Sequence, residues 1–394
     1  MTDGALRMIV LLHFHELGYG PLELSFLFLA YELMGVFTNL FGGWVGAKSG
    51  LDQTLKVGLG IQIIALLVIS FVDADWSKTF SVVFVMLCQA LSGIAKDLTK
   101  MSSKSAVKFI IPEAENDHQQ SRLFRWVAIL TGSKNALKGA GFFIGGALLA
   151  SLNFQKALLL MASIVAFSLF LVMAFLRETI GKSTKIKSRK LLSSPYPAVN
   201  RLSLARMFLF GSRDIWFVVA LPIFLDEDLG WSYSGIGGFL AAWVIGYGFI
   251  QSAAPTMMAT IHSPGGFGTL AKGWAAILCA FTSAIAILVW NDIAKSSVVI
   301  IGLFIFGFLF AINSSLHSFL ILAYTDEDDD VAINVGLYYA ANALGRFVGT
   351  LFSGLAYLWG GLTLALFFSA GFLFVNWVLS LSFPSTSLLK HETN

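Results

Sequence analysis

The chain has 394 residues, of which 57% are hydrophobic and only 12% are charged, and its formal net charge at neutral pH is +3. Soluble domains carry about 25% charged residues, so this composition predicts an integral membrane protein rather than a soluble one. Nothing in the charge distribution indicates nucleic-acid binding. The two cysteines, Cys88 and Cys279, lie far apart in apolar segments, which argues against a disulfide framework or a thiolate metal cluster.

Apolar segments long enough to cross a bilayer recur along the whole chain. A membrane-spanning helix needs about 20 apolar residues. The segments that meet this length are Pro21–Ala47, Leu51–Val72, Thr79–Leu98, Leu123–Leu152, Gln155–Leu176, Leu202–Leu225, Ser232–Thr260, Leu270–Trp290, Ser296–Tyr324, Val331–Trp359 and Leu362–Phe383. A further segment, Gly4–Leu17, is too short to span comfortably. We therefore predict an all-α membrane protein whose first helix is truncated at its N-terminus.

A basic polar segment divides these helices into two groups. It starts at Arg177, carries many lysines and arginines, and is followed by Pro195 and Pro197. Proline and a run of charge are typical of a linker outside the membrane. We predict a six-helix half over residues 1–176, a basic linker over 177–201 and a second six-helix half over 202–394.

The two halves resemble each other in sequence. A shift of 208 residues superposes Lys138 on Arg346 and Gly141 on Gly349. Asp3 is followed by Leu17-Gly18-Tyr19, and Asp214 is followed at nearly the same distance by Leu229-Gly230-Trp231, so these two aspartates also correspond. This pattern predicts two pseudo-repeats, and Asp214 lies deeper in its segment than Asp3, which is the reason for expecting a shortened first helix.

Lysine and arginine concentrate in the second, fourth and sixth loops between the segments. Positively charged loops stay in the cytoplasm. The even-numbered loops and both termini are therefore predicted to be cytoplasmic.

Charged residues occur in the middle of several apolar segments, where they are costly and are normally turned toward a protein interior or a wet cavity. The cations at this depth are Arg7, Lys134, Lys138, Arg213 and Arg346. The carboxylates are Asp3, Glu32 and Asp214. Cations outnumber carboxylates, and buried charge without a counterion is unfavourable, so a bound anion is the simplest way to complete the pairing.

The strongest candidate for an anion site is the segment Trp126–Leu152. Lys134 and Lys138 are four residues apart, so they share one helix face, and Asn135 lies beside them. Lysine supplies a movable point charge, and arginine a flat fork that suits oxyanions. The full set of predicted substrate-binding residues is Lys134, Lys138, Arg213, Arg346, Arg7, Asn135, Asn313, His317 and Asn342.

A structural role is the alternative for each charge: interhelical ion pairs that hold the helices together. Arg7 can pair with Asp3 four residues away. Arg213 and Asp214 are sequence neighbours that point to different sides, so we expect that they do not neutralise each other. Asp3, Glu32 and Asp214 are the candidates for ion pairing or proton coupling, with His317 a further candidate for a proton relay.

Lysines recur at every fourth residue from the end of the fourth segment onward, from Lys96 to Lys108. Lys96 and Lys100 lie nearer the bilayer, where they could form a vestibule that draws anions from the cytoplasm. Anchoring to lipid headgroups is the alternative, and it is favoured for Lys104 and Lys108.

The overall pattern resembles the major facilitator superfamily: twelve segments in two groups of six, a basic central linker, and few ionisable residues in every third segment. The resemblance implies two six-helix repeats, with the uncharged helices at the periphery, and transport by alternating access. Ala47 stands where the family usually has an aspartate in its loop motif after the second helix, which puts the latch role of that loop in doubt.

Longer blocks are similar to the ArsJ-type organoarsenical efflux permeases. These blocks are Thr2–Met8, Leu12–His15, Leu91–Asp97, Leu130–Gly139, Phe210–Phe217, Asn313–Ser318 and Tyr338–Arg346. The resemblance implies export across the cell inner membrane of 1-arseno-3-phosphoglycerate, which a companion glyceraldehyde-3-phosphate dehydrogenase makes from arsenate. It therefore also implies arsenate resistance.

Other functions stay open at this point. The cargo could be another phosphorylated or organic anion, or the protein could be a drug efflux pump, although the excess of cations disfavours cationic drugs. A membrane enzyme is disfavoured, because no segment shows a nucleophile with a base or a set of metal ligands. We expect no catalytic residues, no cofactor and no bound metal; the partners expected are the anionic substrate, the bilayer and the companion dehydrogenase.

Overall fold

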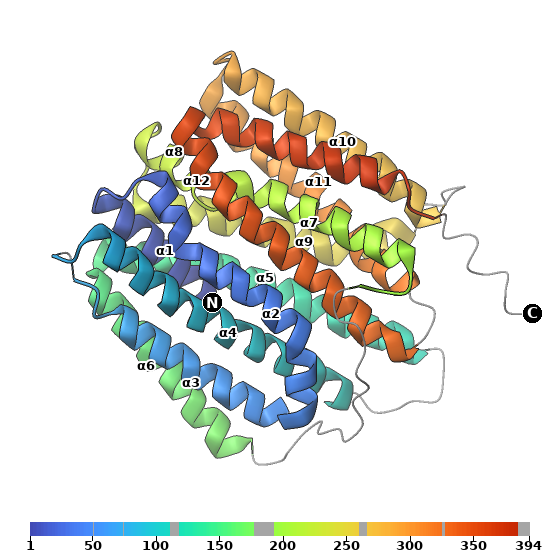
Figure 1. The fold of residues 1–394 in the computed structure, drawn as a ribbon, viewed down its shortest axis with the longest axis horizontal. Coiled ribbons are helices and arrows are strands. Elements are labelled where there is room, and N and C mark those ends of the chain that lie inside the picture. The colour runs from blue at the N-terminus through green and yellow to red at the C-terminus, as the bar shows by residue number, and fades with distance from the viewer. Residues whose placement is uncertain are drawn as a thin grey trace, which may run out of the picture. The chain divides into compact units, whose positions relative to one another are not determined.

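The computed structural model describes residues 1–49, 51–73, 75–110, 118–176, 193–259, 266–324 and 328–384. All regular secondary structure in these residues is α-helical (Figure 1). The helices are α1 Thr2–Glu16, α2 Pro21–Ser49, α3 Leu51–Ile69, α4 Lys78–Ile110, α5 His118–Ser151, α6 Phe154–Phe175, α7 Pro197–Phe217, α8 Ala220–Glu227, α9 Tyr233–Ala259, α10 Gly266–Trp290, α11 Lys295–Ala323 and α12 Asp328–Ser380. Each expected segment except Leu202–Leu225 corresponds to one of these helices or to part of one.

One expected segment differs from the helices in detail: the seventh is broken into α7 and α8. The last two expected segments are the two helical parts of α12, which are separated by non-helical backbone at Gly360 and Gly361, between the expected end at Trp359 and the expected start at Leu362. Gly361 has φ 63°, a left-handed conformation that glycine adopts without steric cost. Nine helical stretches in the described residues are long and apolar enough to cross a membrane.

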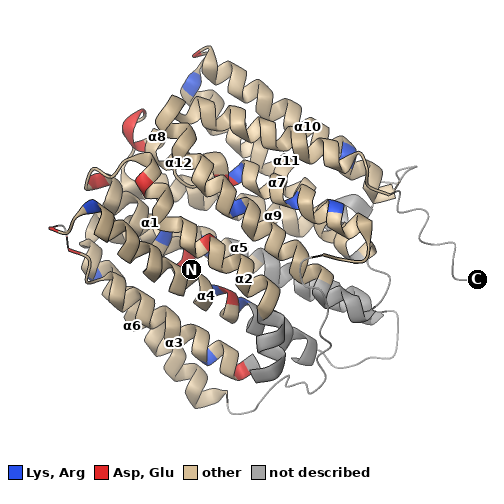
Figure 2. Cartoon of the chain, in the orientation of Figure 1, with Lys and Arg blue, Asp and Glu red and all other residues tan. Residues whose placement is uncertain are grey.

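Large apolar side chains are exposed on several helices, as expected for surfaces that face lipid. On α6, Phe167, Phe170 and Phe175 are all exposed. Exposed aromatic side chains in such number are unfavourable in water but favourable in the hydrocarbon core of a bilayer. In Figure 2 charged residues interrupt α1, α2, α4 and α7 away from their ends, whereas the only charge of α6, Lys156, lies in its first turn.

The chain divides into two compact units. The first unit comprises Met1–Arg189 with Ser232–Ile245, and the second comprises Lys190–Trp231 with Gly246–Asn394. The first part of α9 thus belongs with the N-terminal helices. Gly146 and Gly237 explain this assignment, because a Cβ atom at either would lie within 2.7 Å of a carbonyl oxygen across the α5–α9 contact. The expected partition at the basic linker, residues 177–201, stays a prediction.

Glycine contacts also set the position of α1 in the first unit. A Cβ atom on Gly145 of α5 would lie 2.5 Å from the carbonyl oxygen of Ala5, so the two helix backbones touch there. Likewise, Gly93 of α4 lies against the backbone of Tyr31 on α2, where an added Cβ would be 2.7 Å from the Tyr31 oxygen. These close contacts bring the polar side chains of α1, α2, α4 and α5 within reach of one another.

In the second unit, α7 packs along α12 through a similar close contact between a glycine and a backbone carbonyl. Gly349 of α12 has room for no side chain, because a Cβ atom would lie 2.5 Å from the Gly211 oxygen. At the break between α7 and α8, the Ser353 hydroxyl accepts hydrogen bonds of 3.1 Å from the amides of Val219 and Ala220. Ser353 is fully buried, so it satisfies donors that water does not reach.

Candidate functional site

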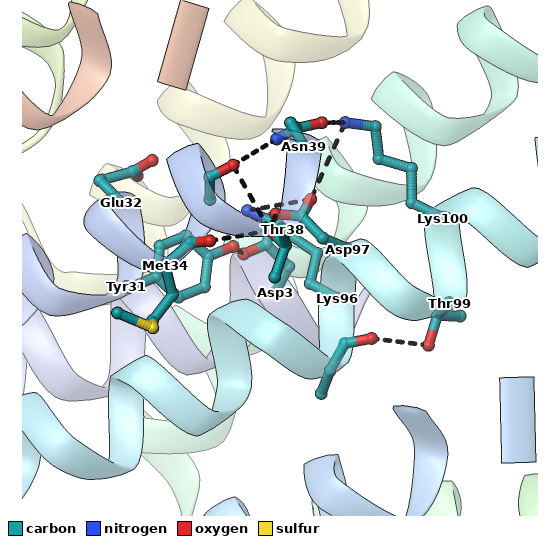
Figure 3. Close-up of polar contacts among 12 residues, drawn as sticks. Asp3, Tyr31, Glu32, Met34, Thr38, Asn39, Lys96, Asp97, Thr99 and Lys100 are labelled. Atoms are coloured by element: carbon teal, nitrogen blue, oxygen red, sulfur yellow. Dashed lines mark hydrogen bonds and ion pairs between the residues drawn. The ribbon is translucent and has the colours of Figure 1, made fainter. Parts of the chain in front are cut away.

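A cluster of charged side chains lies inside the first unit, on α1, α2, α4 and α5. Figure 3 shows its members on α1, α2 and α4. Asp3 of α1 accepts a hydrogen bond from the Tyr31 hydroxyl of α2. The Lys138 ammonium of α5 lies 3.5 Å from the other oxygen of the same carboxylate. The predicted substrate residue Lys138 and the predicted coupling residue Asp3 therefore form one ion pair.

Asp97 of α4 is the second carboxylate of this cluster and is almost fully buried. The Thr38 hydroxyl donates to it at 2.6 Å, and the ammonium groups of Lys100 and Lys96 lie 3.8 Å and 3.9 Å from its Oδ1 atom. The Lys96 nitrogen also lies 4.1 Å from the centre of the Tyr31 ring, a cation–π contact. Through Tyr31, Lys96 connects the Asp97 and Asp3 carboxylates. We call Asp3, Tyr31, Thr38, Lys96, Asp97, Lys100 and Lys138 the N-terminal charge cluster.

Arg7 and Glu32 form a separate buried ion pair. The Arg7 Nη2 atom donates to Glu32 Oε1 at 2.5 Å, and both side chains are nearly inaccessible. The guanidinium carbon also lies 5.1 Å and 5.3 Å from the ring centres of Phe28 and Tyr31. Arg7 thus has a partner on the neighbouring helix α2, whereas local sequence spacing suggests Asp3.

Asp214 is the central carboxylate of the second unit. Arg213 donates from both Nε and Nη2 to its Oδ1 atom, with the Nε bond 2.7 Å long, and Arg346 Nε donates at 3.1 Å to Oδ2. The expectation that Arg213 and Asp214 do not neutralise each other is therefore wrong. Their Cα–Cβ bonds diverge, but the long arginine side chain folds back to reach the carboxylate of its neighbour, and the Phe210 ring lies against it at 5.0 Å.

The same type of ion pair thus occurs in both units. Asp3 pairs with Lys138, and Asp214 pairs with Arg346. These are the residues that the sequence comparison of the two halves puts in correspondence. The first pair joins α1 to α5, which carries Gly141, and the second joins α7 to α12, which carries Gly349.

Positive charge remains in excess after this pairing. In the first unit Arg7, Lys96, Lys100 and Lys138 face Asp3, Glu32 and Asp97. In the second unit Arg213 and Arg346 share Asp214, and Arg206 has no carboxylate partner among the residues that the structure describes. Among these described residues the cations outnumber the carboxylates by one in the first unit and by two in the second. The surplus expected from sequence also includes Lys134, whose side chain lies outside the described residues, and it stays a prediction.

The remaining predicted residues lie in different environments. Asn313 and His317 are fully buried on α11, and the Asn313 amide donates to the carbonyls of Leu309 and Trp274. Asn342 is partly buried on α12. Lys96 and Lys100, the proposed vestibule, lie against Asp97. The side chains of Lys134 and Asn135 lie outside the described residues.

Sequence reasoning missed Tyr31, Thr38, Asp97 and Arg206. Asp97 lies between Lys96 and Lys100, and an aspartate between two lysines could have indicated an ion pair. Arg206 lies seven residues before Arg213 on α7, so both arginines are on the same face of the helix. In the described part of the chain, no group of three or more histidine, cysteine, aspartate or glutamate residues is placed to hold a metal ion.

The model of the Major Facilitator Superfamily matches residues 1–327. The chain belongs to this superfamily. Its fold is similar to that of a POT family transporter solved with a thioalcohol conjugated peptide, with TM-score 0.76 and 16% identity over 99% of this chain and 94% of the other. A comparison with curated protein sequences finds no match.

Two further solved structures of transporters share the fold. A bacterial homologue of the iron transporter ferroportin in its outward-facing state has TM-score 0.67 and 12% identity over 97% of this chain and 95% of the other. The human organic anion transporter MFSD10 (TETRAN) has TM-score 0.63 and 17% identity over 90% and 83%. At this identity the likeness concerns the fold alone. Superfamily membership makes the chain a multi-pass membrane transporter rather than an enzyme.

Proposed function

We propose that the protein exports a small polyanion, specifically the organoarsenical 1-arseno-3-phosphoglycerate, by alternating access. The observation that carries the proposal is that, among the described residues, the buried and half-buried cations around Asp3, Glu32, Asp97 and Asp214 outnumber these carboxylates. Buried charge is stabilised only when it is paired. An anionic substrate supplies the missing negative charge, and a cationic drug does not.

The lysine contacts are of a kind that a substrate can replace. Lys138, Lys100 and Lys96 lie 3.5–3.9 Å from their carboxylates, whereas a charge-assisted hydrogen bond is about 2.7–2.9 Å long. An oxyanion that makes the shorter contact competes well for these ammonium groups. Lys134, Lys138, Arg213 and Arg346 are the residues that we propose hold the oxyanions, with Arg7, Asn135, Asn313, His317 and Asn342 as further contacts.

The identity of the cargo is supported by the sequence blocks that are similar to ArsJ-type permeases. A molecule that carries phosphate, carboxylate and arsenate groups matches a site built from several lysines and arginines. Its source is then a companion glyceraldehyde-3-phosphate dehydrogenase acting on arsenate. Only two cysteines are present, which disfavours trivalent arsenite, a ligand for clustered thiolates.

Energy for export is available from the membrane potential. Moving one negative charge out of a cell whose interior is at about −100 mV releases about 2.3 kcal/mol. Asp3, Glu32, Asp214 and His317 stay candidates for an additional coupling to protons. Unchanged transport after selective collapse of the proton gradient would remove that role from all four.

The test is arsenate resistance of a sensitive bacterial host that expresses the chain with and without the companion dehydrogenase. We expect resistance only when both proteins are present. Lys138→Gln and Lys134→Gln should abolish it while the protein remains in the membrane. Lys156→Gln is the matched control, because Lys156 is exposed on α6.

Each outcome bears on a different part of the proposal. Wild-type resistance in both lysine variants would contradict their assignment as substrate ligands. Absence of resistance in every combination, with the protein verified in the membrane, would contradict the arsenical cargo and favour another phosphorylated anion.

A further inference from the structure

Arg206 is a buried arginine whose charge no carboxylate balances among the described residues. Its side chain is 3% exposed. Nη1 donates to the main-chain oxygen of Ser314 at 2.9 Å, and the guanidinium lies 4.0 Å and 4.8 Å from the ring centres of Phe210 and Tyr338. Nε is buried and has no hydrogen-bond partner. A neutral carbonyl and two aromatic rings thus surround a full positive charge.

The neighbouring polar groups are also incompletely paired. His317 is fully buried, with neither ring nitrogen hydrogen-bonded, and it lies one turn after Ser314, whose carbonyl accepts the hydrogen bond from Arg206. One turn earlier on α11, the side-chain oxygen of Asn313 is buried without a partner as well. Buried polar atoms are hydrogen-bonded in the large majority of cases, so several exceptions in one place call for an explanation.

Hydroxyl and amide groups from three helices complete this environment. The Ser314 hydroxyl of α11 is 3.3 Å from the Tyr247 hydroxyl and accepts a 3.1 Å bond from the Gln251 amide, both on α9. The Ser318 hydroxyl lies 3.4 Å from the Tyr338 hydroxyl of α12. Hydroxyl hydrogens rotate, so these groups can turn toward a ligand that accepts hydrogen bonds.

Arg213 shows how the free edge of Arg206 can be used. Arg213 binds Asp214 through Nε and Nη2, the side of the guanidinium where two N–H groups point the same way. The corresponding edge of Arg206 includes the unpaired Nε atom. That edge is complementary to two oxygens of a phosphate, arsenate or carboxylate group.

We propose that Arg206, with His317 and the hydroxyls of Ser314 and Tyr338, forms an oxyanion-binding site inside the second unit, separate from the Asp214 ion pairs. The anion would bind the Nε edge of the guanidinium while Nη1 keeps its bond to the Ser314 carbonyl, and it would accept hydrogen bonds from His317 and the hydroxyl groups. The inference rests on the proposed function only in taking the natural ligand to be one oxyanion group of the transported molecule. Binding itself is independent of the cargo.

The test is titration of the purified full-length protein in detergent with inorganic phosphate at constant ionic strength, followed by calorimetry. Loss of a charge-assisted hydrogen bond costs enough to weaken binding about tenfold or more. We expect that loss in Arg206→Gln and a smaller one in Arg206→Lys, which keeps the charge without the two-donor edge. The matched control is Arg201→Gln, because Arg201 is exposed on the same helix and donates only a 3.3 Å bond to the Ser382 carbonyl.

Phosphate affinity within about twofold of wild type in Arg206→Gln would overturn the site, as would the absence of phosphate binding to the wild-type protein. If Arg206→Gln does not fold, Arg206→Lys and His317→Leu carry the test, and unchanged affinity in both would overturn it equally. Arg206-dependent phosphate binding without arsenical export would support the site and refute the cargo. Export with Arg206-independent binding would refute the site and leave the proposed function standing.

Discussion

Asp214 is expected to be the most sensitive charged residue of the second unit, because two arginines share it. Asp214→Asn keeps the shape of the side chain but leaves Arg213 and Arg346 facing each other without this negative charge. Removing one partner of a buried ion pair costs about 3–5 kcal/mol. Two positive charges about 6 Å apart also repel by about 3 kcal/mol at an effective dielectric constant of about 20.

The arginine variants should behave differently. Arg346→Gln leaves Asp214 bonded to Arg213, so the cost should be that of one charged hydrogen bond, about 1.5–3 kcal/mol. In the Asp214→Asn background, however, the same substitution removes a repelling charge. The double variant should therefore be more stable than Asp214→Asn alone, by about 2–3 kcal/mol, because most of the repulsion between the two arginines is gone.

The assay is the free energy of unfolding in mixed detergent micelles, measured for the four members of this mutant cycle. Asp228→Asn is the control, because Asp228 pairs with Lys295 at 3.7 Å in an exposed position and such pairs are worth about 1 kcal/mol or less. A double variant no more stable than Asp214→Asn would refute the reasoning. So would an Asp214→Asn cost equal to that of Asp228→Asn.

Two further predictions concern hydroxyl groups. Thr38→Val should lower the free energy of unfolding by about 1–3 kcal/mol, because Asp97 loses a 2.6 Å hydrogen bond. Thr282→Val is the control: it loses only a hydrogen bond to a carbonyl of its own helix, so it should cost less in the same unfolding assay. Ser353→Ala should cost about 1–3 kcal/mol, because it leaves two buried amides unpaired where α7 ends. Ser369→Ala is its control and should be neutral or stabilising, since the buried Ser369 hydroxyl has no partner; equal melting temperatures for the two serine variants would contradict the account.

The helices could be predicted from sequence because a membrane demands long continuous apolar segments. The break between α7 and α8 could not. The amides of Val219 and Ala220 at this break donate to the Ser353 hydroxyl, which is 134 and 133 residues away along the chain. A contact between residues so far apart cannot be predicted from the local sequence. The break between the last two segments, in contrast, was predictable, because Gly360 and Gly361 leave the helical conformation between the expected end at Trp359 and the expected start at Leu362.

The depth of charges was also predictable, but their pairing was only partly so. The correspondence of Lys138 with Arg346 follows from the shift of 208 residues, and that of Asp3 with Asp214 follows from the leucine, glycine and aromatic residue after each; the structure contains both ion pairs. The contact of Arg213 with its own neighbour depends on a side-chain conformation, which helix geometry alone does not give.

Two missed residues lie near expected helix ends. The sequence predicts that the fourth segment ends at Leu98, which places Asp97 at the membrane surface, but α4 continues to Ile110. Arg206 comes soon after the expected start at Leu202, whereas α7 starts at Pro197. Charged residues are common near the ends of membrane helices and rare in the middle. Because the predicted helix ends are wrong by several residues, Asp97 and Arg206 look like ordinary charges at helix ends.

The most direct test of the central claim is transport into everted membrane vesicles, in which an exporter carries its substrate inward. The vesicles receive radiolabelled arsenate, glyceraldehyde 3-phosphate, nicotinamide cofactor and the companion dehydrogenase. We predict that label accumulates only with the complete mixture, that unlabelled phosphorylated anions compete, and that Lys138→Gln abolishes accumulation while Lys156→Gln does not. Accumulation that is equal without the dehydrogenase, or none with the complete mixture in vesicles that contain the protein, would contradict the account.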